Sequence, residues 1–203
     1  MDFLTKFIFH LKKPKLIIVA DKPNSLTIEA LFQILKPDIK CEVIKKINLG
    51  NIFKNQVLIL NSDFKENLVF FIKHSKKPVL AITQLPDDRL EQITKLAENL
   101  PSTGCLILNF DNETVREIRN KTPVFTLAFG FQKMADLRAS DLSIDQKEGA
   151  CNFKIDYDGN IIPIWLKNVC SEQEVLSILA AISCGIQLGL NLVEISQALK
   201  DFK

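Results

Sequence analysis

The residues whose types best suit ligand binding are Lys22, Asn24 and Ser25, which lie between an apolar run at 15–20 and a helical pattern at 26–35. A strand, a short turn and a helix in this order form the frame of a phosphate-binding loop. In such a loop, glycine N–H groups turn toward the anion, a lysine neutralises it and a hydroxyl holds Mg²⁺. The lysine and the hydroxyl make this turn a candidate site for a nucleotide phosphate.

The same turn also contains features that oppose phosphate binding. It has no glycine, Pro23 has no backbone N–H, and Asp21 adds negative charge where a phosphate would lie. One interpretation is an ordinary turn in which Asn24 or Ser25 caps the helix. The other is a weak phosphate site in which Lys22 meets the anion from a shifted position.

The elements around this turn predict an α/β fold. The runs KLIIV, QVLIL, PVLAIT and GCLILNF are apolar throughout, as expected for strands of a parallel sheet that is covered by helices on both faces. The segments between them, including SLTIEALFQIL, KENLVFFIKH, DDRLEQITKLAENL and NETVREIRN, have helical patterns. We therefore predict a mostly parallel sheet flanked by helices.

The pattern changes after residue 123. Residues there alternate between apolar and polar, and the sequence Tyr157-Asp158-Gly159-Asn160 is typical of a hairpin turn, which predicts a small antiparallel β extension. Two helices follow, each introduced by residues at capping-box spacing: Ser171 with Glu174, and Asn191 with Glu194.

Composition limits the classes of function. With 203 residues and 47% hydrophobic side chains, the chain is long enough for one sizeable domain, which we place at 15–203. The 26 basic and 24 acidic side chains nearly balance, so we expect no nucleic-acid partner. No apolar run approaches the roughly 18 residues of a membrane span.

Residues 1–14 predict a separate amphipathic helix. Apolar side chains recur at helical spacing, and lysines lie around them. We expect this apolar face to dock on the core of the domain itself. The alternative is weak contact of residues 3–15 with a membrane surface. The apolar positions are Phe3, Leu4, Phe7, Ile8 and Leu11.

The cysteines and histidines show no metal-binding spacing. Five cysteines are scattered without a C-x-x-C pair, and only His10 and His74 accompany them. We expect reduced thiols in a cytoplasmic protein and no metal site, with a Cys–His nucleophilic pair left as an open alternative. The cysteines are Cys41, Cys105, Cys151, Cys170 and Cys184.

Several phrases, in order, resemble the central ATP-binding domain of the Mur ligases, particularly the type that adds D-alanyl-D-alanine. They are GCLILNFDNETVREI, TLAFGFQKMADLRASDL and NFKIDYDGNIIPIWL, followed by ILAAISCGIQLGLNLVEISQALKDF. The resemblance implies a fold similar to that of P-loop NTPases. It also implies a reaction in which Mg-ATP activates a substrate carboxylate as an acyl phosphate and an amine then attacks it.

Aligned with the phosphate loop of that family, this chain departs at three of four positions. Ala20 and Pro23 replace its two glycines, Asn24 replaces its lysine, and Ser25 keeps a hydroxyl at the Mg²⁺ position. Asn61 stands where the family has a metal-binding glutamate. Other polar positions of the family are also altered, here Gln84, Arg89, Asn112, Gln173, Glu174 and Ser177.

The resemblance also supplies candidate residues for a nucleotide site. Asn109 and Asp111 match the segment that lines that site in the family. If nucleotide binding is retained, we expect Lys22, Asn24, Ser25, Asn109 and Asp111 to bind Mg-ATP. We assign no catalytic residue and no metal ligand, and otherwise expect no cofactor.

Three functions follow as hypotheses. The first is a degenerate, non-catalytic Mur-ligase-like domain that lacks the flanking ligase domains and binds a protein partner, such as a cell-wall synthesis enzyme. The second is the ATP-binding part of a split ligase that joins an acid to an amino acid. The third is a peripheral membrane-binding module at the inner face of the membrane.

Overall fold

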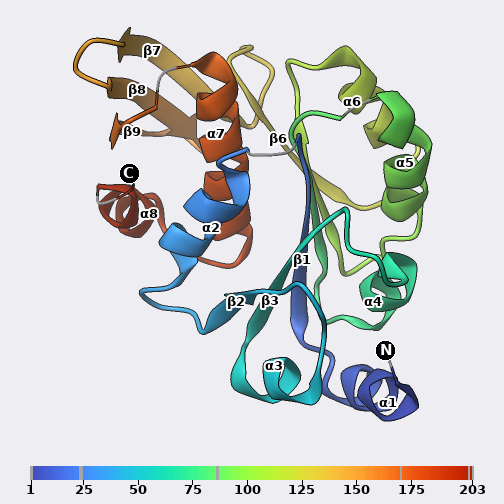
Figure 1. Ribbon diagram of the computed structural model, residues 1–203. Coiled ribbons are helices and arrows are strands. Elements are labelled where there is room, and N and C mark those ends of the chain that lie inside the picture. The colour runs from blue at the N-terminus through green and yellow to red at the C-terminus, as the bar shows by residue number, and fades with distance from the viewer. Residues whose placement is uncertain (1, 23–24, 86, 170, 201, 203) are drawn as a thin grey trace.

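The computed structural model describes residues 2–22, 25–85, 87–169, 171–200 and 202. They form a nine-stranded sheet in the order β2-β3-β1-β4-β5-β6-β7-β8-β9, with helices on both faces (Figure 1). In that order, the pairs from β2-β3 to β6-β7 are parallel, and β8 pairs antiparallel with both β7 and β9. The predicted α/β class and the antiparallel extension are confirmed.

The parallel strands are short and, apart from the edge strand β2 and the start of β6, largely buried. Their apolar side chains point alternately to the two faces of the sheet, and both faces are covered, which explains the unbroken apolar runs in the sequence. The strands are β1 (Lys15–Ala20), β2 (Cys41–Val43), β3 (Val57–Asn61), β4 (Val79–Ile82), β5 (Cys105–Asn109) and β6 (Phe125–Gly130).

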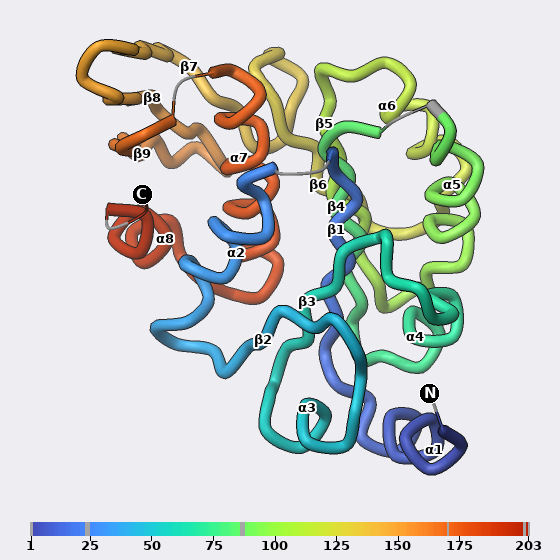
Figure 2. The backbone as a smooth tube through the Cα atoms, viewed as in Figure 1, coloured from blue at the N-terminus to red at the C-terminus, as the bar shows by residue number. Residues whose placement is uncertain are grey.

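Two groups of helices cover the sheet, as the backbone trace in Figure 2 shows. One face packs against α2 (Thr27–Leu35), α7 (Glu172–Gln187) and α8 (Leu192–Leu199). The other face, including the end where the parallel strands begin, packs against a second group of helices. They are α1 (Phe3–Lys12), α3 (Leu49–Lys54), α4 (Leu68–His74), α5 (Leu90–Glu98) and α6 (Glu113–Asn120). Within the described residues, no helix has the length and apolar character needed to cross a bilayer.

The antiparallel extension consists of β7 (Leu137–Asp145), β8 (Ala150–Tyr157) and β9 (Asn160–Lys167). Tyr157 pairs with Asn160 across a two-residue turn, in which Asp158 and Gly159 have φ values of 50° and 74°. Positive φ at both central positions is the geometry of a type I′ hairpin turn, so the predicted hairpin is confirmed.

Helix caps agree with most of the sequence signals. Asn191 accepts hydrogen bonds from the backbone N–H groups of Val193 and Glu194, and the Glu194 carboxylate accepts one from the Asn191 N–H at 2.8 Å. Ser171 Oγ accepts a bond from the Glu174 N–H at 3.3 Å. Sequence reasoning missed α3, whose six residues are too few to show a helical period.

The N-terminal helix docks on the core of the domain, as predicted, but not through most of the apolar side chains expected to make that contact. Phe9 and Thr5 are the buried residues of α1, and the Phe9 ring lies 4.9 Å from the ring of Phe71 on α4. Of the predicted apolar positions, Ile8 is half-buried and packs against the core, whereas Phe3 and Phe7 remain exposed. The helix docks by its opposite side because one large ring fits between α1 and α4, whereas the longer apolar stripe finds no surface of this domain to cover it.

The close packing of α7 against α2 and α8 depends on Gly185. A Cβ atom added at Gly185 would lie 3.0 Å from Ile34 Cγ2 and 3.2 Å from Ile195 Cδ1. We expect Gly185→Leu to lower the free energy of unfolding by about 1–3 kcal/mol through overpacking. Urea denaturation would measure it, with Gln187→Leu at a partly exposed position of the same helix as the control. An unchanged midpoint for Gly185→Leu would contradict this packing argument.

Candidate functional site

The turn after β1 opens into a small cavity at the carboxyl ends of the strands. The cavity has a volume of about 200 Å³ and lies where the chain leaves β1 on one side and β4 on the other. This is the position at which parallel α/β sheets usually bind ligands. Its lining residues are Asp21, Lys22, Ser25 and Leu26 from the turn, Gln84 after β4, and Gln173, Glu174 and Ser177 from the first turns of α7.

Asp21 is the buried charge of this cavity, with a relative exposure of 6%. Its carboxylate accepts a hydrogen bond from Thr27 Oγ1 at 2.6 Å and another from the Lys22 N–H at 2.7 Å. Ser177 Oγ lies 3.4 Å from the same carboxylate and 3.2 Å from the Gln173 carbonyl. A hydroxyl has one proton, so Ser177 donates to one of these two acceptors at a time.

This arrangement places an anion of the protein at the start of α2. Thr27 is the first residue of that helix, where free N–H groups and the helix dipole favour negative charge. The sequence suggested only that Asp21 would repel a phosphate. Its partners could not be predicted, because Thr27 is six residues away and Ser177 is 156 residues away.

Two predicted residues, Lys22 and Ser25, do line the cavity. Lys22 is exposed, and its carbonyl accepts a hydrogen bond from the Ser25 N–H at 3.3 Å. The expectation that Ser25 caps α2 is wrong, since Leu26 occupies the cap position and no side chain bonds there. Asn24 and Pro23 lie outside the described residues.

Asn109 and Asp111 are not among the residues that line this cavity. Asn109 is buried, and its amide donates to the Thr83 carbonyl at 3.1 Å, which ties the end of β5 to the end of β4. The Asp111 carboxylate accepts hydrogen bonds from the N–H groups of Phe131 and Gln132. Both side chains therefore hold neighbouring loops together.

The close fit around Asp111 explains Gly130. A Cβ atom at Gly130 would lie 2.7 Å from the carboxylate oxygens of Asp111, a distance that neither group could accommodate without moving. The turn after β6 is thus shaped by the carboxylate that follows β5.

The guanidinium of Arg89 is bonded to the residues that follow β3. Asn61, which the resemblance aligns with a metal-binding glutamate of the family, accepts a hydrogen bond from the Asp63 N–H at 3.0 Å. Arg89 donates to the Asp63 carboxylate and, at 2.8 Å, to the hydroxyl of the buried Ser62. An ion pair therefore forms at the residues that directly follow the position where the resemblance implies a metal ligand.

The two histidines contact each other, and two of the buried cysteines are poor nucleophiles. The rings of His10 and His74 lie 4.9 Å from each other at the contact of α1 with α4. Burial raises the pKa of the Cys105 thiol to about 12 and also raises that of Cys184, which disfavours the thiolate. No group of three or more His, Cys, Asp or Glu side chains in the described part is arranged to hold a metal ion. Cys170 lies outside the described residues.

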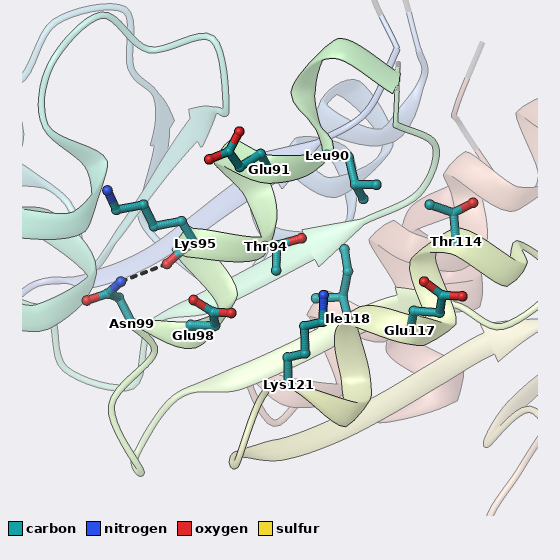
Figure 3. Close-up of a pocket in the computed structure, with 10 residues that line it drawn as sticks. All are labelled: Leu90, Glu91, Thr94, Lys95, Glu98, Asn99, Thr114, Glu117, Ile118 and Lys121. Atoms are coloured by element: carbon teal, nitrogen blue, oxygen red, sulfur yellow. Dashed lines mark hydrogen bonds between the residues drawn. The ribbon is translucent and has the colours of Figure 1, made fainter.

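A larger cavity of about 530 Å³ lies between α5 and α6, away from the turn after β1 (Figure 3). Lysines and glutamates alternate along its walls, and the amide of Asn99 donates to the Lys95 carbonyl at 2.7 Å. It contains none of the predicted site residues. Because its charges are mixed and do not converge, it has no evident preference for an anion or a cation.

Comparison with known proteins places the fold. No family model matches the chain. UDP-N-acetylmuramate–L-alanine ligase of Xylella fastidiosa is 29% identical over 135 residues, 61% of this chain and 28% of that protein. The same ligase of Caldicellulosiruptor bescii is 26% identical over 110 residues, 54% of this chain and 24% of that protein. The chain thus spans about a quarter of the length of these curated relatives.

Superposition on solved structures covers more of this chain than the sequence matches do. MurF from Acinetobacter baumannii superposes with a TM-score of 0.79 and 16% identity, over 98% of this chain and 49% of that one. The fold is that of a Mur ligase central domain. MurF from Thermotoga maritima in complex with ADP gives 0.70 and 15% identity, over 95% of this chain and 50% of that one.

The resemblance inferred from the sequence is therefore confirmed. The sequence relatives named here add L-alanine, whereas the superposed structures are MurF enzymes. The similarity to the D-alanyl-D-alanine type in particular stays a prediction.

The contact between Asp21 and Thr27 can be tested by a double-mutant cycle. We expect Thr27→Val to lower the free energy of unfolding by about 1–3 kcal/mol, because it leaves a buried carboxylate with one fewer donor. Asp21→Ala and the double variant complete the cycle, read by urea denaturation. Ser177→Ala is the matched control and should cost less, since its hydroxyl is shared between two acceptors. Additive effects of Asp21→Ala and Thr27→Val would contradict the contact.

Proposed function

We propose that this chain is a Mur-ligase-like domain that has lost catalysis and acts by binding another protein. The observation that carries the proposal is the carboxylate of Asp21, which is hydrogen bonded to Thr27 in the turn where the resemblance implies a nucleotide phosphate. The protein's own carboxylate thus lies at the start of α2, where its negative charge opposes the approach of an external anion.

Electrostatics favours this interpretation. Two unit negative charges about 4 Å apart repel by roughly 4 kcal/mol at an effective dielectric constant of about 20. Arg89 supplies a second obstacle, because its guanidinium is bonded to Ser62 and Asp63 and so occupies the carboxylate that follows Asn61, where a divalent cation would need a carboxylate ligand. Mg-ATP therefore fits these residues poorly, and we derive no catalytic step through it.

The rate of phosphoryl transfer that would remain after such changes is small. Phosphoryl transfer depends on positioning and on neutralising charge, and loss of one preorganised electrostatic contact costs on the order of 10²-fold to 10³-fold in rate. In the alignment that the resemblance implies, Asn24 and Asn61 stand in place of the family's phosphate-binding lysine and metal-binding glutamate. The apolar core does not need those groups, so a stable and inactive domain is physically reasonable.

A split ligase is the second candidate, because Lys22 and Ser25 both line the cavity after β1. In this interpretation the chain binds Mg-ATP, and other polypeptides supply the remaining domains and substrates. A Mur ligase of this fold has been solved with ADP, which makes the nucleotide a reasonable probe.

Nucleotide calorimetry separates the two candidates. We expect no binding of Mg-ATP by the natural chain, and recovered binding when Asp21→Gly, Pro23→Gly and Asn24→Lys are combined with Ala20→Gly. The matched control carries Asn24→Gln in place of Asn24→Lys, which restores space without charge and should bind at least about tenfold more weakly. Circular dichroism would verify that each variant folds. Micromolar, Mg²⁺-dependent binding by the natural chain would overturn the non-catalytic proposal and support the split ligase.

The partner role has its own test. A cell-wall synthesis enzyme, such as a complete Mur ligase, is the partner we expect on the basis of the relatives' activity. Purified chain and candidate ligases should elute together in size-exclusion chromatography, and the chain should change ligase turnover. Separate elution and unchanged turnover with every ligase of the pathway would contradict this role.

A further inference from the structure

The helix α1 is attached to the domain by one side and leaves the other side uncovered. Phe9 is fully buried against Phe71 of α4, and Thr5 is buried while bonding to Asp2. Lys76 also donates its N–H to the Pro14 carbonyl at 3.2 Å, which joins the end of α1 to the end of α4. The helix is therefore fixed in place, and its outer side is a feature of the folded domain.

That outer side is apolar. Phe3, Leu4, Phe7 and Leu11 are 84%, 56%, 49% and 60% exposed, and the rings of Phe3 and Phe7 stack at 6.4 Å. At 3.6 residues per turn these four positions fall within about 100° of the helix circumference, opposite Phe9. They form one continuous stripe, which we call the α1 stripe.

The surroundings of the α1 stripe are basic. The segments 3–15, 49–54 and 68–77 form α1, α3, α4 and their ends, which pack on one another at the start of the parallel strands. They hold eight lysines and no carboxylate, which leaves 18 of the 26 basic side chains against all 24 acidic ones elsewhere. Asp2, the N-cap of α1, adjoins the stripe, and its carboxylate accepts hydrogen bonds from Thr5. Glu42 is the carboxylate that α3 contacts, and it is engaged by the amides of Asn51 and Asn55. The lysines are Lys6, Lys12, Lys13, Lys15, Lys54, Lys73, Lys76 and Lys77.

We propose that the α1 stripe docks on an anionic phospholipid bilayer, with α1 lying in the plane of the membrane surface. By helical spacing Lys6 and Lys12 flank the stripe, and their ammonium groups lie 5.8 Å and 5.1 Å from the ring centroids of Phe70 and Phe53. Long lysine side chains can turn from such exposed ring contacts to lipid headgroups while the apolar stripe enters the acyl region. Lysines on α3 and α4 add attraction to the same anionic surface.

Charge decides between a membrane and a second copy of the chain. Pairing two copies through the α1 stripe would bring two sets of lysines together, which opposes self-association. A bilayer with anionic headgroups complements both the apolar stripe and the lysines around it. The geometry also sets an orientation: β1 runs away from α1, so the cavity beside Asp21 faces away from the membrane.

Vesicle sedimentation tests the proposal with the full chain. Vesicles of phosphatidylcholine with phosphatidylglycerol should pellet the protein, and vesicles of phosphatidylcholine alone should bind it at least about tenfold more weakly. Raising the salt from about 0.1 M to about 0.5 M should weaken binding several-fold. Phe3→Ser with Phe7→Ser, and separately Lys6→Gln with Lys12→Gln and Lys13→Gln, should each reduce binding about tenfold or more.

The matched control is Ile161→Ser with Trp165→Ser, which removes two similarly exposed apolar side chains from β9 and should leave binding unchanged. Thermal unfolding of each variant verifies the fold. The proposal is overturned if the protein fails to pellet with anionic vesicles, or if the Phe3/Phe7 variant binds as well as the natural chain. A concentration-dependent dimer in analytical ultracentrifugation that this variant abolishes would assign the stripe to a second copy instead.

Discussion

Burial of both faces of the parallel sheet is the constraint on which the rest of this structure depends. The central strand β1 pairs with β3 on one side and β4 on the other, and its side chains enter two separate apolar clusters. Each cluster needs a layer of helices, which fixes where α2 and α7 lie relative to α4 and α5. The same pairing brings the turn after β1 beside the residue that follows β4, and so creates the cavity at this edge.

At the carboxyl ends of the strands, the polar side chains are bonded mainly to the protein itself. Asp21 is held by Thr27, Asn109 by Thr83, and Arg89 by Ser62 and Asp63. Groups of these types can bind ligands on the same edge of an α/β sheet, but here they join loop to strand and loop to helix. This internal use of polar groups is the physical basis for proposing a binding domain in place of a catalyst.

The two ends of the sheet also differ in chemistry. The end where the strands begin carries the uncovered stripe of α1 and a surplus of lysines, whereas the end where they finish carries the small polar cavity. A central domain whose two ends differ in this way can meet two different surfaces at once. The proposed membrane contact and the proposed protein partner are therefore compatible in space.

The sequence by itself determined the α/β class, the hairpin at Asp158 and Gly159, the capped C-terminal helices and the resemblance to the Mur ligases. These depend on local periodicity, turn chemistry and phrases that can be read in order. It could not determine that Asp21 lies within hydrogen-bond distance of Ser177, that Asn109 donates to the carbonyl of Thr83 after β4, or that α1 docks through Phe9. Those contacts join segments far apart in the chain, so only the packing of the sheet and its two helix layers decided which polar groups were bonded internally and which apolar face remained exposed.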